Sequence, residues 1–597
     1  MIRKALQDYF SELDSKIEPI EEFVLGQSIG QILNAREEKL TDHDELAEYM
    51  AFQFMADYHN KETGWGTYYG PMMVMKNDQG QFVEFPSIKL IDEPMITYWR
   101  KRFAEAKNPL LAYRYADLVF DFEPKVLNKT IDFQVAQKII DSCLEICEKN
   151  LDDGLGCRQK LERSLSLAVQ INDSTRISGL IKAIIDAEDK YAEDDKPGLW
   201  GYAFRWLILS KNNRVTVSDE QKNKLIKDME DRLQRLSSLE DPDPWRIENA
   251  VLVLAEYYAG LKDSINLERV VGLLEAGFRK NKYANSDGLL ITNYLEKLIE
   301  VYSQYASFDF AKTARQRIVT EMSNLGDRGK FAMTEISTEV KVSNEEIKKF
   351  IDAIFGTDKS DKLEKIVAKI AVNFVLPKKG VETQLNNLAK DHPLMFLVGH
   401  VIMSEDGYPI ARFDSLNDDY DKHLLENFSK NLHFQSFFFR MVMDKLRSDY
   451  TPEQVLETIM ASPAFKTEDR DYILKLLKSF WDKDYLVSSF LGIPLIEDTV
   501  RNFYRINNQS YIKNNDDGGY DVQNLDTLLG RGLIKAAFQS MGENFEYYLK
   551  VLLTERVGWN LRNNFAHGIN KKEFGSEDVA GRILHVLLCF SILRKKE

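Results

Sequence analysis

Amphipathic helical segments follow one another with only short polar breaks from about residue 130 to 340, and this pattern constrains the fold more than any other feature. The segments lie near 159–171, 175–190, 199–210, 219–237, 245–261, 266–279, 286–305 and 308–323. Their apolar positions recur three and four residues apart, which predicts helices with one buried face. Such faces need a neighbouring helix to cover them, so we expect stacked helical hairpins, as in an α-solenoid. No strict repeat period indicates a named repeat type.

Two short stretches outside this region have strand-like residues on either side of a turn. The first lies near 68–85, with a turn at Asn77–Gly80, and the second lies near 395–413, with a turn at Asp406–Gly407. Aromatic and β-branched residues that flank Asn, Asp and Gly are typical of β-hairpins. We therefore predict two small hairpins within a mainly α protein.

The length of 597 residues predicts several domains. We expect an N-terminal helical domain with the first hairpin, an α-solenoid-like region, a linking helical region with the second hairpin, and a compact C-terminal helical bundle. These span residues 1–130, 131–340, 341–469 and 470–597. In the C-terminal bundle the apolar pattern predicts helices at about 484–506, 543–566 and 577–593, with short helices around 525–539.

The composition is that of a soluble globular protein, with 44% apolar and 29% charged residues. Only four cysteines occur, which favours a reducing compartment, and the N-terminus has no apolar signal core. The apolar run Leu584–Leu593 is about half of the ~20 residues that cross a bilayer. We therefore expect a cytoplasmic protein that does not contact a membrane.

Negative charge is concentrated before residue 470. The net charge is −15, yet residues 470–597 hold 18 Lys and Arg against 16 Asp and Glu. The overall acidity argues against general nucleic-acid binding and favours a protein partner for the acidic helical region. The near-neutral C-terminal region is compatible with a local phosphate site.

The strongest chemical signal lies near the C-terminus. Arg562 and His567 stand five positions apart, Asn563 follows the arginine, and Gly568 follows the histidine at an expected helix end. A guanidinium stabilises phosphoryl charge, and an imidazole transfers protons near neutral pH. Together they can cleave RNA without a metal, and we expect no metal or cofactor here.

A single helix over 543–566 would group several polar side chains. At 100° per residue Arg556, Asn560, Asn563 and His567 fall within an arc of about 60°. The asparagine amides can hold an imidazole or a ligand by hydrogen bonds. This stripe therefore supports a binding or catalytic site on one face of the helix.

Arg562 and His567 lie about 140° apart on an ideal helix. They converge only if the helix unwinds near His567, which Gly568 favours, or if two copies of the chain meet. Glu555, seven residues before Arg562, is a candidate to orient or neutralise the guanidinium. The alternative is that His567 only caps the helix C-terminus of a helical scaffold.

The string from Arg556 to Gly568 resembles the HEPN superfamily of helical ribonuclease and nucleotide-binding domains. It is most similar to an uncharacterised bacterial branch in which such a domain ends a long helical protein. The segments Asp484–Tyr485, Pro494–Glu497, Gly70–Met72 and Arg114–Leu118 are also similar to that branch. The stronger part of the resemblance covers about the last 130 residues.

This resemblance implies a metal-independent endoribonuclease that acts on RNA as a homodimer formed through the C-terminal domain. His567 would be the general acid and base, Arg562 would stabilise the phosphorane, and Asn563 would position them. The nucleophile would be the 2′-OH of the substrate. Many members are toxins or antiviral (phage-defence) effectors, which implies regulation. Some carry a tyrosine two residues after the histidine as a nucleotide acceptor, whereas this chain has Ile569.

The alternative function is a non-catalytic HEPN-like module that dimerises or binds a nucleotide within a helical interaction scaffold. A second possible site, Cys143 and Cys147 with Cys157, lacks a fourth ligand nearby, so we interpret these residues as buried thiols. We interpret Asp42–Asp44 as a helix N-terminus rather than part of a metal site.

Overall fold

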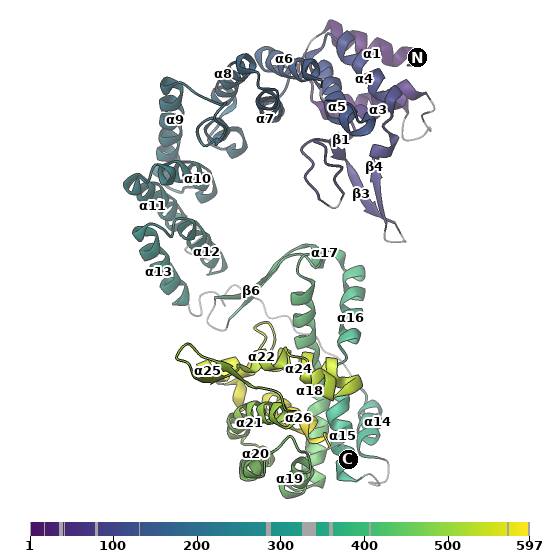
Figure 1. Cartoon of the computed structure of the whole chain (residues 1–597), viewed down its shortest axis with the longest axis vertical. Helices are drawn as coiled ribbons and strands as arrows, with labels where there is room; N and C mark the ends of the chain where they lie inside the picture. The colour runs from purple at the N-terminus through teal and green to yellow at the C-terminus, as the bar shows by residue number, and fades with distance from the viewer. Residues whose placement is uncertain are drawn as a thin grey trace. The chain divides into compact units, whose positions relative to one another are not determined.

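The computed structural model describes residues 2–16, 18–34, 40, 42–61, 63–77, 81–130, 132–281, 288–324, 342–356, 362–404, 408–569 and 572–594. Helices α1–α26 make up most of these residues, and the strands within them form four antiparallel sheets of two strands each (Figure 1). The predicted mainly α fold is therefore confirmed. No helix in the described part of the chain is long and apolar enough to cross a membrane.

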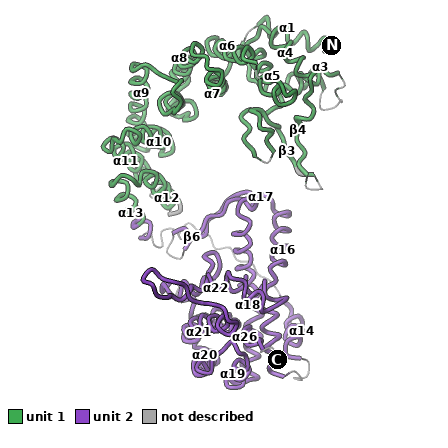
Figure 2. The backbone as a smooth tube through the Cα atoms, viewed as in Figure 1, with its two compact units in different colours: residues 1–319 green, residues 320–597 purple. Residues whose placement is uncertain are grey.

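The chain divides into two compact units, residues 1–319 and 320–597 (Figure 2). Unit 1 contains α1 (Lys4–Ser15), α2 (Glu22–Leu33), α3 (His43–Ala51), α4 (Glu93–Glu105), α5 (Pro109–Leu127), α6 (Phe133–Lys149), α7 (Gly154–Gln170), α8 (Ser174–Tyr191), α9 (Asp219–Ser238), α10 (Pro244–Gly260), α11 (Ser264–Lys280), α12 (Gly288–Gln304) and most of α13 (Asp309–Ser323). The finer division into four regions stays a prediction.

Most helices of unit 1 pack against the next one along the chain, from α4 to α8 and from α9 to α12. Side-chain caps begin many of them: Ser218 forms a capping box before α9, and Asp42 accepts hydrogen bonds from the N–H groups of Asp44 and Glu45 at the start of α3. The interpretation of Asp42–Asp44 as a helix start is thus confirmed. The expected helix near 199–210 contains instead a 3₁₀ turn, Pro197–Leu199, and a π-helical stretch, Phe204–Ile208.

Both predicted hairpins form, but the second begins at His400 and not near 395, because residues 395–397 belong to the short helix Pro393–Leu397. Strands β3 (Met73–Lys76) and β4 (Phe82–Phe85) pair, as do β5 (His400–Met403) and β6 (Pro409–Phe413), while the tips at 78–80 and 405–407 lie outside the described residues.

Two further sheets were not predicted. Strand β1 (Phe54–Met55) pairs with β2 (Gly70–Pro71), and β7 (Ile512–Asn514) pairs with β8 (Tyr520–Val522). Their strands of two or three residues are too short to show an alternating pattern.

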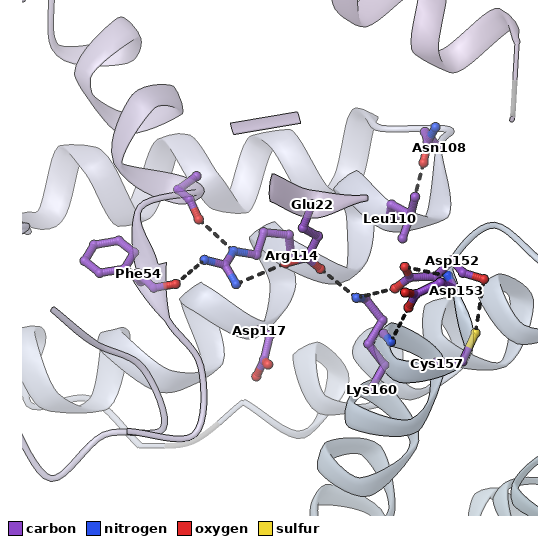
Figure 3. A network of polar contacts seen from close by, with 12 residues as sticks. Glu22, Phe54, Asn108, Leu110, Arg114, Asp117, Asp152, Asp153, Cys157 and Lys160 are labelled. Carbon is purple, nitrogen blue, oxygen red and sulfur yellow. Dashed lines mark hydrogen bonds and ion pairs between the residues drawn. The ribbon is translucent and has the colours of Figure 1, made fainter. Parts of the chain in front are cut away.

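Buried charges join α2, α5 and α7 in unit 1 (Figure 3). Arg114 donates hydrogen bonds to the carbonyls of Ala51 and Phe54 and pairs with Glu22. Lys160 pairs with Glu22 at 2.9 Å and with Asp152 at 2.8 Å. Each charge has a partner, as buried ions require. The segment Arg114–Leu118 therefore has a structural role in this unit.

Unit 2 has one continuous hydrophobic core that extends from Ile354 to Phe590. Its helices are α14 (Asn344–Phe355), α15 (Leu363–Asn373), α16 (Lys378–Asp391), α17 (Pro393–Leu397), α18 (Tyr420–Asp449), α19 (Pro452–Met460), α20 (Arg470–Trp481), α21 (Tyr485–Ile506), α22 (Leu525–Leu529), α23 (Leu533–Ala537), α24 (Gly542–Leu553), α25 (Leu561–His567) and α26 (Glu577–Ser591). Helix α26 is central, because α15, α18, α19 and α21 all pack on it. The expected boundary at 469/470 lies inside this core.

The predicted long helix over 543–566 is wrong, because the chain leaves the helix after Leu553 and re-enters one at Leu561. Gly558 lies against the end of α24, where an added Cβ would be 2.1 Å from the Val551 carbonyl oxygen. Asn560 then adopts a left-handed φ of +52°. Only glycine fits the close approach, so Gly558 allows the chain to fold back. The single-helix argument for a polar stripe no longer applies.

Candidate functional site

Helix α25 carries the Arg/His motif and ends at the predicted residue. Gly568 has a left-handed φ of +65°, and the N–H groups of Gly568 and Ile569 donate to the carbonyls of Phe565 and Asn564 at 3.2 and 2.8 Å. This is a helix C-terminal motif that favours glycine. His567 is exposed in the last turn and makes no hydrogen bond or ion pair with any residue that the structure describes.

Arg562 points to α21 and not to His567. Its Nε donates to Oε1 of Glu497 at 2.5 Å, and the other oxygen of Glu497 pairs with Arg501 at 2.6 Å. Glu497 ends the Pro494–Glu497 segment, so two of the segments that carry the resemblance meet here. The expected partner Glu555 is not the one observed, since the break after α24 moves it away from the face of Arg562. Desolvation and the nearby Asp526 raise the pKa of Glu555.

Hydrogen bonds between side chains extend from Arg562 towards the start of α25. Its Nη1 donates to Oδ1 of Asn563 at 3.3 Å, and Nδ2 of Asn563 donates to Oδ1 of Asn560 at 2.8 Å and to the Thr554 carbonyl at 3.2 Å. The Glu497 carboxylate thus orients Asn563 through the guanidinium. Arg562 acts on the asparagines as a positioning residue.

A cavity of about 680 Å³ lies beside α25. The hairpin β5–β6 contributes Ser404, Tyr408 and Ile410, α18 contributes His433, and the rest of the lining is Arg556, Gly558, Trp559, Asn560, Asn563, Asn564, His567, Ile569, Glu573, Ser576, Asp578 and Val579. Four of the six predicted site residues are therefore brought together around it. Arg562 and Glu555 are not among the described residues that line it.

Arg556 is the cation of this cavity. Its side chain is exposed and forms no ion pair with any described residue, whereas the Arg562 guanidinium is neutralised by Glu497. An unpaired guanidinium can donate two N–H groups to a phosphate. Arg556 can therefore bind an anion in a cavity that His567 also lines, together with the carboxylates of Glu573 and Asp578.

His433 was not predicted as a site residue. Its imidazole stacks on the indole of Trp559, with ring centroids 4.3 Å apart and ring planes 23° apart. Desolvation lowers its pKa, Arg582 lowers it further, and Asp578 opposes them. His433 lies on α18, outside the region of the resemblance, and no local motif marks it. Only the packing of α18 on the C-terminal helices reveals it.

The ion pair between α21 and α25 gives a stability prediction. Glu497→Gln should lower the free energy of unfolding of unit 2 by about 1–2 kcal/mol, because it leaves Arg562 and Arg501 without their carboxylate in a site where Glu497 is only 14% exposed. Urea unfolding followed by circular dichroism measures the change.

Glu543→Gln is the matched control, because Glu543 and Lys535 are 58% and 56% exposed at a distance of 3.8 Å. We expect almost no change there. Equal losses in the two variants would contradict a structural role for the Glu497–Arg562 pair.

The cysteine cluster in unit 1 consists of free thiols. Cys143 and Cys157 are buried, and Cys147 is half-buried. A hydrogen bond with Cys147 and burial raise the pKa of the Cys157 thiol well above its usual value. Within the described ranges, no group of three or more His, Cys, Asp and Glu side chains is arranged to hold a metal ion.

Comparisons with protein-family models, with curated proteins and with solved structures give no match for this chain.

Proposed function

We propose that the chain is a metal-independent endoribonuclease of HEPN type whose active site is the cavity beside α25. The observation that carries this proposal is the cavity lining, which combines the free imidazole of His567, the unpaired guanidinium of Arg556 and the amides of Asn560, Asn563 and Asn564. These groups match the needs of RNA transesterification, which are proton transfer and stabilisation of phosphoryl charge.

The reaction needs no nucleophile from the protein. The ribose 2′-OH attacks the adjacent phosphorus and gives its proton to His567, and the bond from phosphorus to the 5′-oxygen then breaks. The same imidazole returns the proton to the leaving 5′-oxygen. The products are a 2′,3′-cyclic phosphate and a 5′-hydroxyl. Arg556 would donate to the non-bridging phosphate oxygens.

Arg562 would support this chemistry from a distance. The resemblance implies direct stabilisation of the phosphorane, whereas its observed contacts favour a positioning role through Asn563. We also propose a homodimer through the C-terminal helices, in which a second copy would bring its motif to the site. Light scattering of the purified chain tests the dimer.

The acidic residues before position 470 favour a protein partner for the helical region, which would restrain or trigger the nuclease. We propose that the protein acts in the cytoplasm as a regulated effector of the toxin or antiviral type. Capture of a basic protein partner by the full-length chain, at low salt and not at high salt, would support this part of the proposal.

The second candidate function is nucleotide binding without turnover. The stacked rings of His433 and Trp559 favour it, because aromatic surfaces bind bases whether or not cleavage follows. Retained affinity for a nucleotide together with no cleavage of any RNA would select this function.

Incubation of the purified chain with total RNA in EDTA tests the proposed function. We expect fragments with 2′,3′-cyclic phosphate and 5′-hydroxyl ends. Fragments with other ends would contradict it, as would the absence of cleavage for the chain alone and with its captured partner.

Arg556 provides a test of the charge in the cavity. Arg556→Ala should lower the cleavage rate about tenfold, the value of one charge-assisted hydrogen bond at an exposed site, and should leave the unfolding midpoint unchanged. Single-turnover kinetics on a defined RNA measures the rate.

Lys513→Ala removes another exposed cation of unit 2 and is the matched control for Arg556→Ala. We expect it to cleave at the wild-type rate. A rate for Arg556→Ala equal to that of Lys513→Ala would exclude a role for Arg556.

A further inference from the structure

One wall of the cavity is a stack of two rings that differ in exposure. Trp559 is only 7% exposed, whereas His433, whose ring lies parallel to it at 4.3 Å, belongs to the exposed residues of α18. The indole is therefore the inner ring of the stack. The imidazole is the outer ring, and it is the one that a ligand in the cavity can reach.

Both rings are held in place by the backbone around them. The backbone N–H of Trp559 donates to the Val551 carbonyl at 2.9 Å, which holds the backbone that carries the indole against the end of α24. On α18 the neighbours Leu432 and Ser436 are buried in the core, so the helix presents His433 in a fixed direction. A pre-organised aromatic surface binds a flat ligand with little loss of conformational freedom.

The buried Nε1 of Trp559 has no hydrogen-bond partner among the residues that the structure describes. A buried indole usually satisfies this donor, so the contacts of this ring with the described residues are made by its face and not by its N–H. Its face supports the imidazole of His433.

Hydrogen-bonding side chains surround the stack. The Nδ2 group of Asn564 donates to the Trp559 carbonyl at 3.3 Å, while no hydrogen bond in the described part of the chain engages Nδ2 of Asn560. Asn560 and Asp578 also line the cavity, as does Arg556. A flat aromatic surface, amide and carboxylate groups, and a cation together suit a base attached to a phosphate.

We propose that the outer face of His433 is a stacking site for an unpaired RNA base next to the phosphodiester held by Arg556 and His567. The choice of RNA as ligand rests on the proposed function. The base must leave its helix to stack here, so the site selects single-stranded RNA over duplex RNA. Desolvation lowers the pKa of His433 and so favours the neutral ring, and the stacking does not require its charge.

The test uses the full-length chain with His567→Ala, which prevents cleavage, and a short single-stranded RNA that contains 2-aminopurine. Stacking of this base quenches its fluorescence. We expect quenching on binding, a loss of affinity of about tenfold or more for His433→Ala, and affinity within about threefold of the parent for His433→Phe, because phenylalanine preserves the flat surface. His392→Ala, at an exposed histidine of unit 2, should change nothing.

Two results would overturn the inference. The first is equal affinity and quenching for His433→Ala and the parent chain. The second is a His433→Phe variant, with His567 intact, that binds RNA normally but cleaves it as slowly as His433→Ala, which would make His433 a proton-transfer residue. Unfolding midpoints of both His433 variants confirm that they fold.

The outcomes separate this inference from the proposed function. Quenching that depends on His433 without any cleavage by the wild-type chain would overturn the nuclease and keep the stacking site. Cleavage that needs His567 but not His433 would overturn the stacking site alone. A chain that binds no RNA overturns both.

Discussion

Replacement of His567 by alanine is expected to lower the rate of RNA cleavage in EDTA by about 10²- to 10⁴-fold, which is the usual contribution of a general acid and base. The imidazole lies exposed in the last turn of α25, lines the cavity and has no partner among the described residues. Its loss therefore removes proton transfer and little else. The free energy of unfolding should fall by no more than about 1 kcal/mol.

His392→Ala is the matched control, because His392 is also an exposed histidine of unit 2 and lies away from the cavity lining. It should cleave RNA at the wild-type rate. If His567→Ala loses stability but keeps its cleavage rate, His567 is only a helix cap. If both variants keep both the stability and the cleavage rate of the wild-type chain, the cleavage comes from a contaminant or from another site.

The second large effect is a pH-dependent loss of stability that arises from His585 on α26. This residue is fully buried: the Tyr548 hydroxyl donates to its Nδ1 at 3.0 Å, and its Nε2 donates to the Ile370 carbonyl at 3.3 Å. Desolvation, together with the nearby Arg582, lowers the pKa of His585 from 6.5 to about 3. The folded state therefore holds a neutral imidazole.

Between pH 6.5 and about 3 the unfolded chain binds a proton at His585 that the folded chain does not bind. The contribution of the neutral His585 to the free energy of unfolding is complete above pH 6.5 and is lost as the pH falls below this value. From pH 7 to 4.5 the loss is roughly 2.5 kcal/mol. Urea unfolding at the two pH values measures it.

His585→Gln removes the titrating group and keeps an acceptor for Tyr548 and a donor for Ile370. All other groups titrate in both proteins, so the difference between their pH profiles isolates His585. We expect the variant to lose about 2.5 kcal/mol less than the wild type between pH 7 and 4.5. Parallel profiles would show that His585 does not titrate on unfolding.

Periodicity predicted α21 and α26 and the short helices α22 and α23 of unit 2, since it is a local feature. In the structure Ser576 caps α26, Asp484 caps α21, and Thr451 forms the capping box of α19. Gly568 ends α25 as expected. The ends of these helices depend on a few neighbouring side chains, and each helix has one apolar face. Both features can be recognised in the sequence.

The break between α24 and α25 could not be predicted in this way. Val557 and Leu561 continue the apolar face of Leu553 at four-residue spacing, while the break depends on the contact of Gly558 with the Val551 carbonyl. This contact is tertiary and overrides helix propensity.

The dependence on tertiary contacts also explains why the predicted geometry of the site was wrong. The side chains of Asn560, Asn563 and His567 were expected together for a geometric reason that is wrong, yet they line one cavity. The pairing of Arg562 with Glu497 joins segments far apart in the sequence. No spacing rule connects them, because the packing of α25 on α21 creates the contact.

The most direct measurement compares two oligonucleotides in EDTA. One is an all-ribose RNA that the protein cleaves at a mapped position, and the other carries a single 2′-deoxynucleotide on the 5′ side of that bond. The proposed reaction predicts cleavage of the first and none of the second, because the 2′-OH is the nucleophile. Cleavage of both at similar rates, or failure to cleave any RNA, would contradict the assignment of the cavity as a metal-independent ribonuclease site.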